Sequence, residues 1–162
     1  MPTEHLANPS SWQWLPHAFS AGMIFAGWTV VYRNAKKIAS RNETFSLIGR
    51  IRDSVQKVED YASDYYTDTD ENRIDSYLWE GKLLAKIDSI RTDAMHLQSR
   101  NISLNNLRIV DLRRTATLNA EQVTKMDNAQ KRQKITEVKA AGTQLLNELD
   151  AQFLTSNTFL KP

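Results

Sequence analysis

Apolar residues recur along most of the chain at the spacing of helices. From Thr44 onward they stand three and four residues apart with polar residues between them, the period of an amphipathic helix. No stretch shows the apolar and polar alternation of a β-strand. Between residues 17 and 161 no proline interrupts the backbone, so long helices are permitted. We therefore expect an all-α fold.

Residues 18–37, AFSAGMIFAGWTVVYRNAKK, break this pattern because their apolar residues go all round a helix. A core helix of a small domain would show a polar face instead. No Asp, Glu, Lys or Arg occurs between Glu4 and Arg33. A helix over residues 16–32 would be about 25 Å long, close to the ~30 Å hydrocarbon core of a bilayer. The pattern predicts a single N-terminal transmembrane helix over residues 16–32.

Two other interpretations of this segment compete with a membrane span. A signal peptide needs a positively charged start, and residues 1–17 contain no Lys or Arg. A buried core helix stays open as an alternative, because Ser20, Gly22 and Thr29 make the run only moderately apolar.

Aromatic and basic residues flank the predicted span as they do at membrane surfaces. The aromatic residues stand at both edges and the basic residues at one edge only. These predicted interface residues are Trp12, Trp14, Trp28, Tyr32, Arg33, Lys36, Lys37 and Arg41. Since positive charge favours the cytoplasmic side, we expect the C-terminal region to be cytoplasmic and residues 1–15 to form a short extracytoplasmic tail.

Small residues recur within the predicted span at intervals of four. Ala18, Gly22 and Ala26 would form a stripe along which two helices could pack closely. Small residues are also common in spans that do not associate, so self-association through this stripe is one of two interpretations.

The cytoplasmic region is expected to comprise a basic juxtamembrane segment (33–42), a helical bundle (43–155) and a C-terminal tail (156–162). Its first helix carries a regular apolar seam, formed by Ile48, Ile51, Val55 and Val58. The seam is too short to establish a coiled coil, and we favour one face of an intramolecular bundle. Either Asn42 or Thr44 starts a new helix, or the span continues into this one.

Turn residues divide the rest of the bundle. A loop at 67–72 precedes a second amphipathic helix over 73–101. Ser103 is the expected N-cap of a short third helix containing Leu104, Leu107, Val110 and Leu112. Asn119 is the expected N-cap of a last helix over 120–154, whose polar middle, 127–134, either projects into solvent or is a break. The prediction is a bundle of three to four antiparallel helices.

Composition limits the chemistry that the chain can perform. The 162 residues carry a net charge of +2 and include no cysteine, which excludes disulfides, thiolate metal sites and a cysteine nucleophile. Asp68, Asp70 and Asn72 have the first three ligand spacings of an EF-hand, but its required Gly and Glu positions hold Arg73 and Trp79.

No catalytic constellation accompanies these residues. His5, His17 and His96 stand apart from other metal ligands, and no phosphate-binding loop or nucleophile elbow occurs. We expect no enzyme activity, metal or cofactor.

Two basic clusters could contact the phosphates of nucleic acid or anionic lipid. One comprises Arg108, Arg113 and Arg114, and the other comprises Lys131, Arg132 and Lys134. Interleaved acids and the small net charge favour a solvated face, so nucleic acid is not an expected partner.

The segments FAGWTVVYRNAKKIASRNETFSLI and LRIVDLRRTATLNAEQ resemble a group of small uncharacterised bacterial inner-membrane proteins. The resemblance implies one N-terminal span and a cytoplasmic helical region, and it implies no activity.

The leading functional hypothesis is a non-enzymatic, membrane-anchored protein that binds a partner or itself at the cytoplasmic face of a bacterial inner membrane. The expected partners are the lipid bilayer and either another protein or a second copy. An alternative is a membrane-perturbing, holin-like or defence-associated effector whose spans oligomerise. A soluble nucleic-acid-binding bundle is the third hypothesis.

Overall fold

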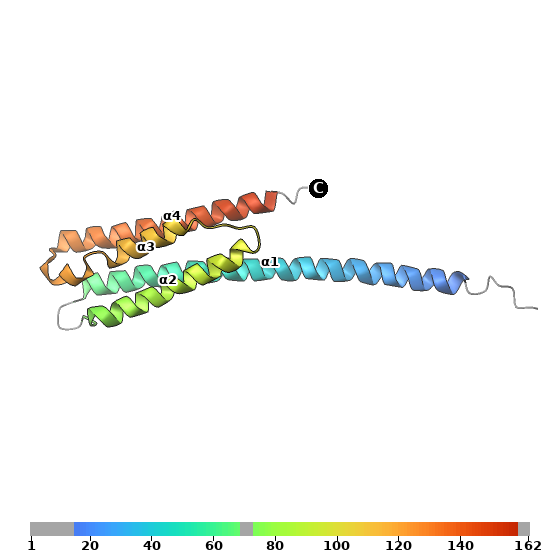
Figure 1. Ribbon diagram of the computed structural model, residues 1–162, viewed down its shortest axis with the longest axis horizontal. Helices are drawn as coiled ribbons and strands as arrows, with labels where there is room; N and C mark the ends of the chain where they lie inside the picture. The colour runs from blue at the N-terminus through green and yellow to red at the C-terminus, as the bar shows by residue number, and fades with distance from the viewer. Residues whose placement is uncertain (1–14, 69–72, 159–162) are drawn as a thin grey trace, which may run out of the picture. The chain divides into compact units, whose positions relative to one another are not determined.

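The computed structural model describes residues 15–68 and 73–158, which form helices joined by short connections. The elements are α1 (Leu15–Thr67), α2 (Ser76–Gln98), α3 (Asn106–Thr117), the 3₁₀ helix η1 (Ala120–Lys125) and α4 (Asn128–Thr158) (Figure 1). No strand occurs in these described ranges, and the prediction of an all-α protein is confirmed. The chain divides into two compact units, Met1–Asn42 and Glu43–Pro162.

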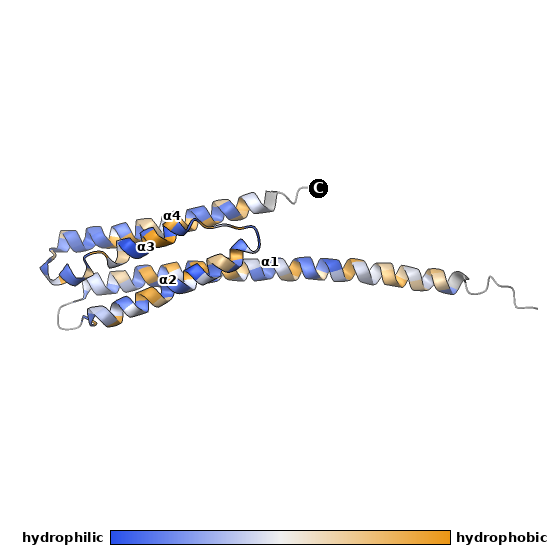
Figure 2. Ribbon diagram, in the orientation of Figure 1, coloured by the Kyte–Doolittle hydropathy of each residue, from blue (hydrophilic) through white to orange (hydrophobic). Residues whose placement is uncertain are grey.

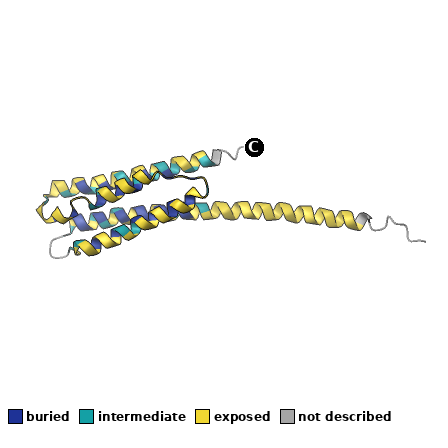
Figure 3. Cartoon of the chain, viewed as in Figure 1, coloured by how far each residue is buried: buried dark blue, intermediate teal, exposed yellow. Residues whose placement is uncertain are grey.

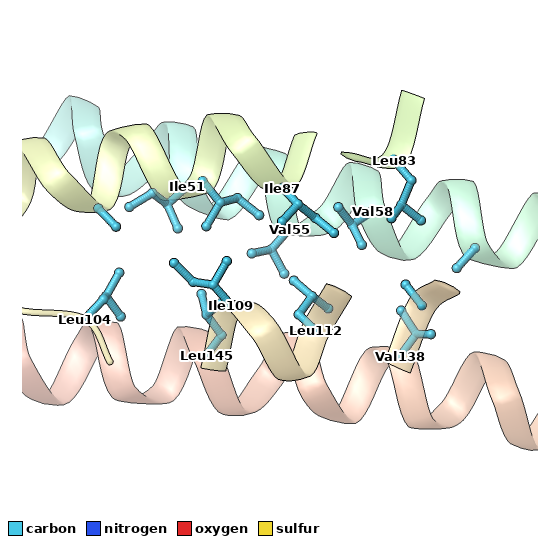
Figure 4. Packing of buried hydrophobic residues seen from close by; sticks show 14 of the residues in the cluster. Ile51, Val55, Val58, Leu83, Ile87, Leu104, Ile109, Leu112, Val138 and Leu145 are labelled. Carbon is cyan, nitrogen blue, oxygen red and sulfur yellow. The ribbon is translucent and has the colours of Figure 1, made fainter. Parts of the chain in front are cut away.

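The second unit is a helical bundle, as the sequence predicts. Figure 1 shows that α2 and α4 run opposite to the C-terminal part of α1, whereas α3 runs in the same direction as that part. Apolar side chains from all four α-helices meet in one core (Figure 4). Ile51 and Val55 of α1, Leu83 of α2, Leu112 of α3 and Leu145 of α4 are almost completely buried there.

Polar residues cap α2 and α3. The Asp75 carboxylate accepts a hydrogen bond from the Tyr77 backbone N–H at 2.9 Å, and α2 begins at the next residue, Ser76. For α3 the cap is Asn105, whose Oδ1 accepts from the Leu107 N–H at 3.0 Å. The prediction of Ser103 as this N-cap is wrong, because the chain is still in the connection there.

The last predicted helix is interrupted near its start. Asn119 precedes the 3₁₀ helix η1 at its N-cap position, but its backbone is left-handed (φ 62°) and its side chain makes no capping hydrogen bond, so it does not cap the long last helix that was predicted. The six residues after it form η1, and α4 begins only at Asn128. Asp127 and Gln130 exchange backbone-to-side-chain hydrogen bonds at 2.7 and 3.0 Å, a capping box that starts α4. The polar stretch 127–134 therefore follows the break, and α4 extends to Thr158 rather than ending near residue 154.

Neither Asn42 nor Thr44 starts a new helix, since α1 is continuous through both residues. Within residues 15–68 and 73–158, no helix combines the length and apolarity needed to cross a membrane. The structure therefore does not support the span predicted over 16–32. The physical reason is that Ser20, Gly22 and Thr29 dilute the large apolar residues between them.

Candidate functional site

The first unit presents a continuous apolar surface. Every residue from 17 to 42 is exposed (Figure 3), and apolar residues dominate as far as Tyr32 (Figure 2). The large side chains are 59–79% exposed. They are Phe19, Met23, Ile24, Phe25, Trp28, Val30, Val31 and Tyr32. Soluble monomers rarely expose so much contiguous apolar surface, so this segment is the strongest candidate for a contact with another molecule or phase.

Large and small residues occupy different sectors of this helix. Successive residues of an α-helix are rotated by about 100°, which spreads the large side chains over about two thirds of the circumference. Ala18, Gly22 and Ala26 fall in the remaining third, and all three are exposed. A Cβ placed on Gly22 would meet nothing within 4 Å. The stripe is therefore open to close approach by another helix.

The segment also satisfies a polar group internally. Thr29 Oγ1 donates a hydrogen bond to the Phe25 carbonyl oxygen at 2.8 Å, within the same helix. Because this hydroxyl is already hydrogen-bonded, removing it from water costs less free energy than removing an unbonded hydroxyl. The first Lys or Arg of the chain is Arg33, and Arg33, Lys36, Lys37 and Arg41 are all exposed. Trp12 and Trp14, the other predicted interface residues, lie outside the described residues, as do His5, Asp70 and Asn72.

The predicted seam lies inside the bundle. Ile48 is 5% exposed, and Ile51, Val55 and Val58 are 0% exposed. Figure 4 shows Ile51, Val55 and Val58 of α1 near Leu83 and Ile87 of α2 and opposite α3 and α4. The chain covers its own seam, so the seam is not an external docking surface.

A polar pocket of about 320 Å³ lies on the bundle, between α1 and the end of α2. It is lined by Glu43, Ser46, Leu47, Arg50, His96, Ser99 and Arg100. Both arginines are already paired: Arg50 donates to the Asp93 carboxylate at 2.8 and 3.2 Å, and Arg100 binds Glu43. The ion pair with Asp93 raises the pKa of Arg50, which keeps this guanidinium charged. The pocket is a set of satisfied ion pairs rather than a preformed anion site.

Aromatic residues close the other end of the bundle. Tyr65 and Trp79 stack with ring centroids 4.1 Å apart, and Trp79 Nε1 donates to the Tyr61 carbonyl at 2.8 Å. The Tyr65 and Tyr66 hydroxyls donate to the carbonyls of Ala120 and Ala116. Burial raises the pKa of Tyr66, so its hydroxyl stays protonated. These contacts tie α1 to α2, α3 and η1 and give the cluster a structural role.

The basic clusters are partly used within the bundle. Arg108 donates to Glu148 at 3.3 Å and to Gln144 at 3.0 Å, and Lys134 is 8% exposed with Glu137 at 4.0 Å. Arg113, Arg114 and Arg132 are exposed, as a solvated face requires. No group of three or more potential metal ligands occurs in the part of the chain that the structure describes.

The apolar residues expected in the third helix do not all face the core. Among the residues expected in the third helix, Leu104 and Leu112 are buried, but Leu107 is 66% and Val110 is 56% exposed. The core face of α3 consists of Ile109, Leu112 and Ala116. Their three-and-four spacing is a helical signal visible in the sequence, but Leu107 and Val110 are also three residues apart, so the spacing does not single out the core face.

Comparisons of the chain with protein-family models, curated proteins and solved structures find no significant match. The resemblance to small bacterial inner-membrane proteins therefore stays a prediction.

Proposed function

We propose that the protein is a non-enzymatic membrane-anchored helical protein of a bacterial inner membrane. Residues 18–32 would contact lipid, and the bundle would bind a partner or a second copy at the cytoplasmic face. The observation that carries the proposal is the charge-free apolar surface of residues 18–32, exposed all round its helix and followed at once by basic residues.

Lipid is the environment that best fits this surface. Burying large apolar side chains gives about 1.5–3 kcal/mol each, a strong drive to remove these residues from water. Of the residues that dilute the apolar run, Gly22 costs little in lipid because glycine carries no polar side-chain atom. Thr29 is bonded within the helix. Small residues are also the ones that let membrane helices pack together.

The flanking residues support an orientation. Trp28 and Tyr32 are 71% and 68% exposed near the end of the apolar run, where amphipathic rings suit a membrane interface. The four exposed basic residues that follow favour a cytoplasmic location for the C-terminal unit. The pore-forming alternative has less support, because Ser20 and Thr29 are the only hydroxyl side chains between residues 18 and 31 that could line a pore.

A carbonate wash of membranes tests the anchor. We expect the full-length protein to stay in the membrane pellet, because an embedded apolar helix resists extraction that removes peripheral proteins. Ile24→Arg/Phe25→Arg should move most of the protein to the supernatant, since both positions lie at the middle of residues 16–32 and each arginine costs about 2.5–3.5 kcal/mol at the centre of a span.

The matched control places two arginines at exposed apolar positions of the bundle. Tyr77 and Leu78 are 84% and 65% exposed on α2, and Tyr77→Arg/Leu78→Arg should stay with the membrane. Release of the wild-type protein by carbonate would overturn the proposal.

A further inference from the structure

Helix α3 carries a second apolar face opposite the one that it buries in the core. Leu107, Val110 and Leu118 are 66%, 56% and 48% exposed, whereas Ile109, Leu112 and Ala116 are buried. Leu118 is the C-cap that directly follows α3, and its backbone N–H still donates to the Arg114 carbonyl at 2.9 Å, as in the helix. At about 100° per residue, Leu107, Arg114 and Leu118 therefore lie within about 40° of one another on the surface. They form a ridge with Val110 and Asp111 on its two sides.

The ridge and its edge carry two opposite charges, Arg114 and Asp111, that make no ion pair within the bundle. Asp111 and Arg114 are both exposed, and within residues 15–68 and 73–158 neither belongs to an ion pair. By contrast, Arg108 on the same helix is bonded to α4. Asp111 and Arg114 are therefore available to an external partner.

Two copies of this face can pair with each other when they lie antiparallel. When two copies of α3 lie antiparallel with their centres between residues 112 and 113, Leu107 faces Leu118 of the second copy. In the same register Asp111 faces Arg114, and each pair occurs twice because the arrangement is twofold symmetric. A parallel arrangement would instead bring Arg114 against Arg114 and Asp111 against Asp111.

We propose that the protein forms a twofold-symmetric dimer through antiparallel packing of α3, with Leu107, Asp111, Arg114 and Leu118 at its centre. The occupant of this face is a second copy of the chain, because apolar residues and charges are both self-complementary in a single register. One face of a 12-residue helix buries less than a standard interface of about 1,600 Å², so the dimer is weak. Concentration of the chains at a membrane would favour it.

This inference deepens the self-association included in the proposed function, and it does not depend on the anchor. A crosslinking measurement on the detergent-solubilised full-length protein reports the dimer. The carbonate wash reports the anchor, so the two proposals fail separately.

Site-directed crosslinking tests the antiparallel register, and the absence of native cysteine makes each introduced thiol unique. Leu107→Cys and Leu118→Cys chains, carrying different tags and mixed, should be joined by a short bismaleimide crosslinker. Each variant alone should crosslink to itself several-fold less. Equal or stronger crosslinking of Leu107→Cys to itself, or no crosslinking in any mixture, would overturn the proposal.

A charge exchange tests the partner residues in the same assay. Asp111→Arg, or Arg114→Asp, turns both Asp111–Arg114 pairs of the dimer into pairs of like charge. Either change should raise the protein concentration needed for half-maximal crosslinking roughly tenfold. The double variant Asp111→Arg/Arg114→Asp restores opposite charges and should return to within about twofold of the unsubstituted pair. Asp88→Arg, at an exposed position of α2, is the control that should change nothing. Failure of the double variant to recover, with circular dichroism showing an intact fold, would contradict the pairing.

Discussion

Gly142 of α4 makes room for a carboxylate between two helices. A Cβ at this position would lie 2.2 Å from Glu59 Oε1 and 3.0 Å from Val55 Cγ1, both on α1. The missing side chain thus lets Glu59 extend between α1 and α4. Burial raises the pKa of Glu59, and this effect exceeds the opposing attraction of Lys139. The ionised carboxylate is therefore less favourable in the folded protein than in the unfolded chain.

The prediction at this position concerns pH. Folding raises the pKa of Glu59, so ionised Glu59 lowers the free energy of unfolding. This destabilisation is fully present above the pKa of the folded protein, and it disappears below the pKa of the unfolded chain. Glu59→Gln should raise the melting temperature by a few degrees at pH 7 and have little effect near pH 4. Circular dichroism melts of the detergent-solubilised protein measure this difference.

Glu80→Gln is the matched control, since Glu80 is exposed on α2. It should leave the melting temperature unchanged at both pH values. A lower melting temperature for Glu59→Gln at pH 7 would mean that the attraction to Lys139 outweighs the burial.

At the scale of elements, the sequence predicted helices and faces where one signal dominated. On α1 the seam from Ile48 to Val58 has no competing apolar face, and all four seam residues are buried. On α3 two apolar faces coexist, and the sequence alone did not show which one the core takes. The N-caps were predicted incorrectly for a related reason. Ser103, Asn105 and Asn119 are all residue types that can cap a helix, and tertiary packing selects among them.

The candidate site was predictable only in part. The charge-free run and its basic flank are visible in the sequence, because they depend on composition alone. The ridge on α3 was not visible, since exposure of Leu107 and Leu118 follows from how α3 packs against α2 and α4.

The seam yields a prediction at the scale of one helix. Ile51 is 0% exposed, and Ile51→Asp would bury a charge without a partner at a cost of several kcal/mol. We expect loss of cooperative thermal unfolding and of much of the helical circular dichroism of the bundle. Lys57→Asp, on the same helix at an exposed position, should keep both within error. A fully helical Ile51→Asp protein that has only lost self-association would place the seam in an interface between copies.

At the scale of the whole molecule, charge is distributed unevenly along the chain. No Lys or Arg precedes Arg33, whereas 21 occur from there to the C-terminus. Four of them follow the apolar segment within nine residues of Tyr32, well inside the roughly 15–20 residues over which positive charge controls orientation. For an anchored protein, this asymmetry determines which side of the membrane the bundle occupies.

The last prediction concerns that topology. A reporter active only outside the cytoplasm should be silent when fused after Pro162, because moving the basic flank across the membrane is unfavourable. Replacing Arg33, Lys36, Lys37 and Arg41 by Gln while changing Thr3, Ser10 and Ser11 to Lys reverses the asymmetry, and a substantial fraction of the reporter should then become active. The control exchanges four distant basic residues for Gln, namely Arg113, Arg114, Lys131 and Arg132. It should stay silent, since charges far from a span contribute little to its orientation. An active reporter on the unsubstituted chain would show that the basic flank does not set the orientation, and it would place the bundle and its α3 face outside the cytoplasm.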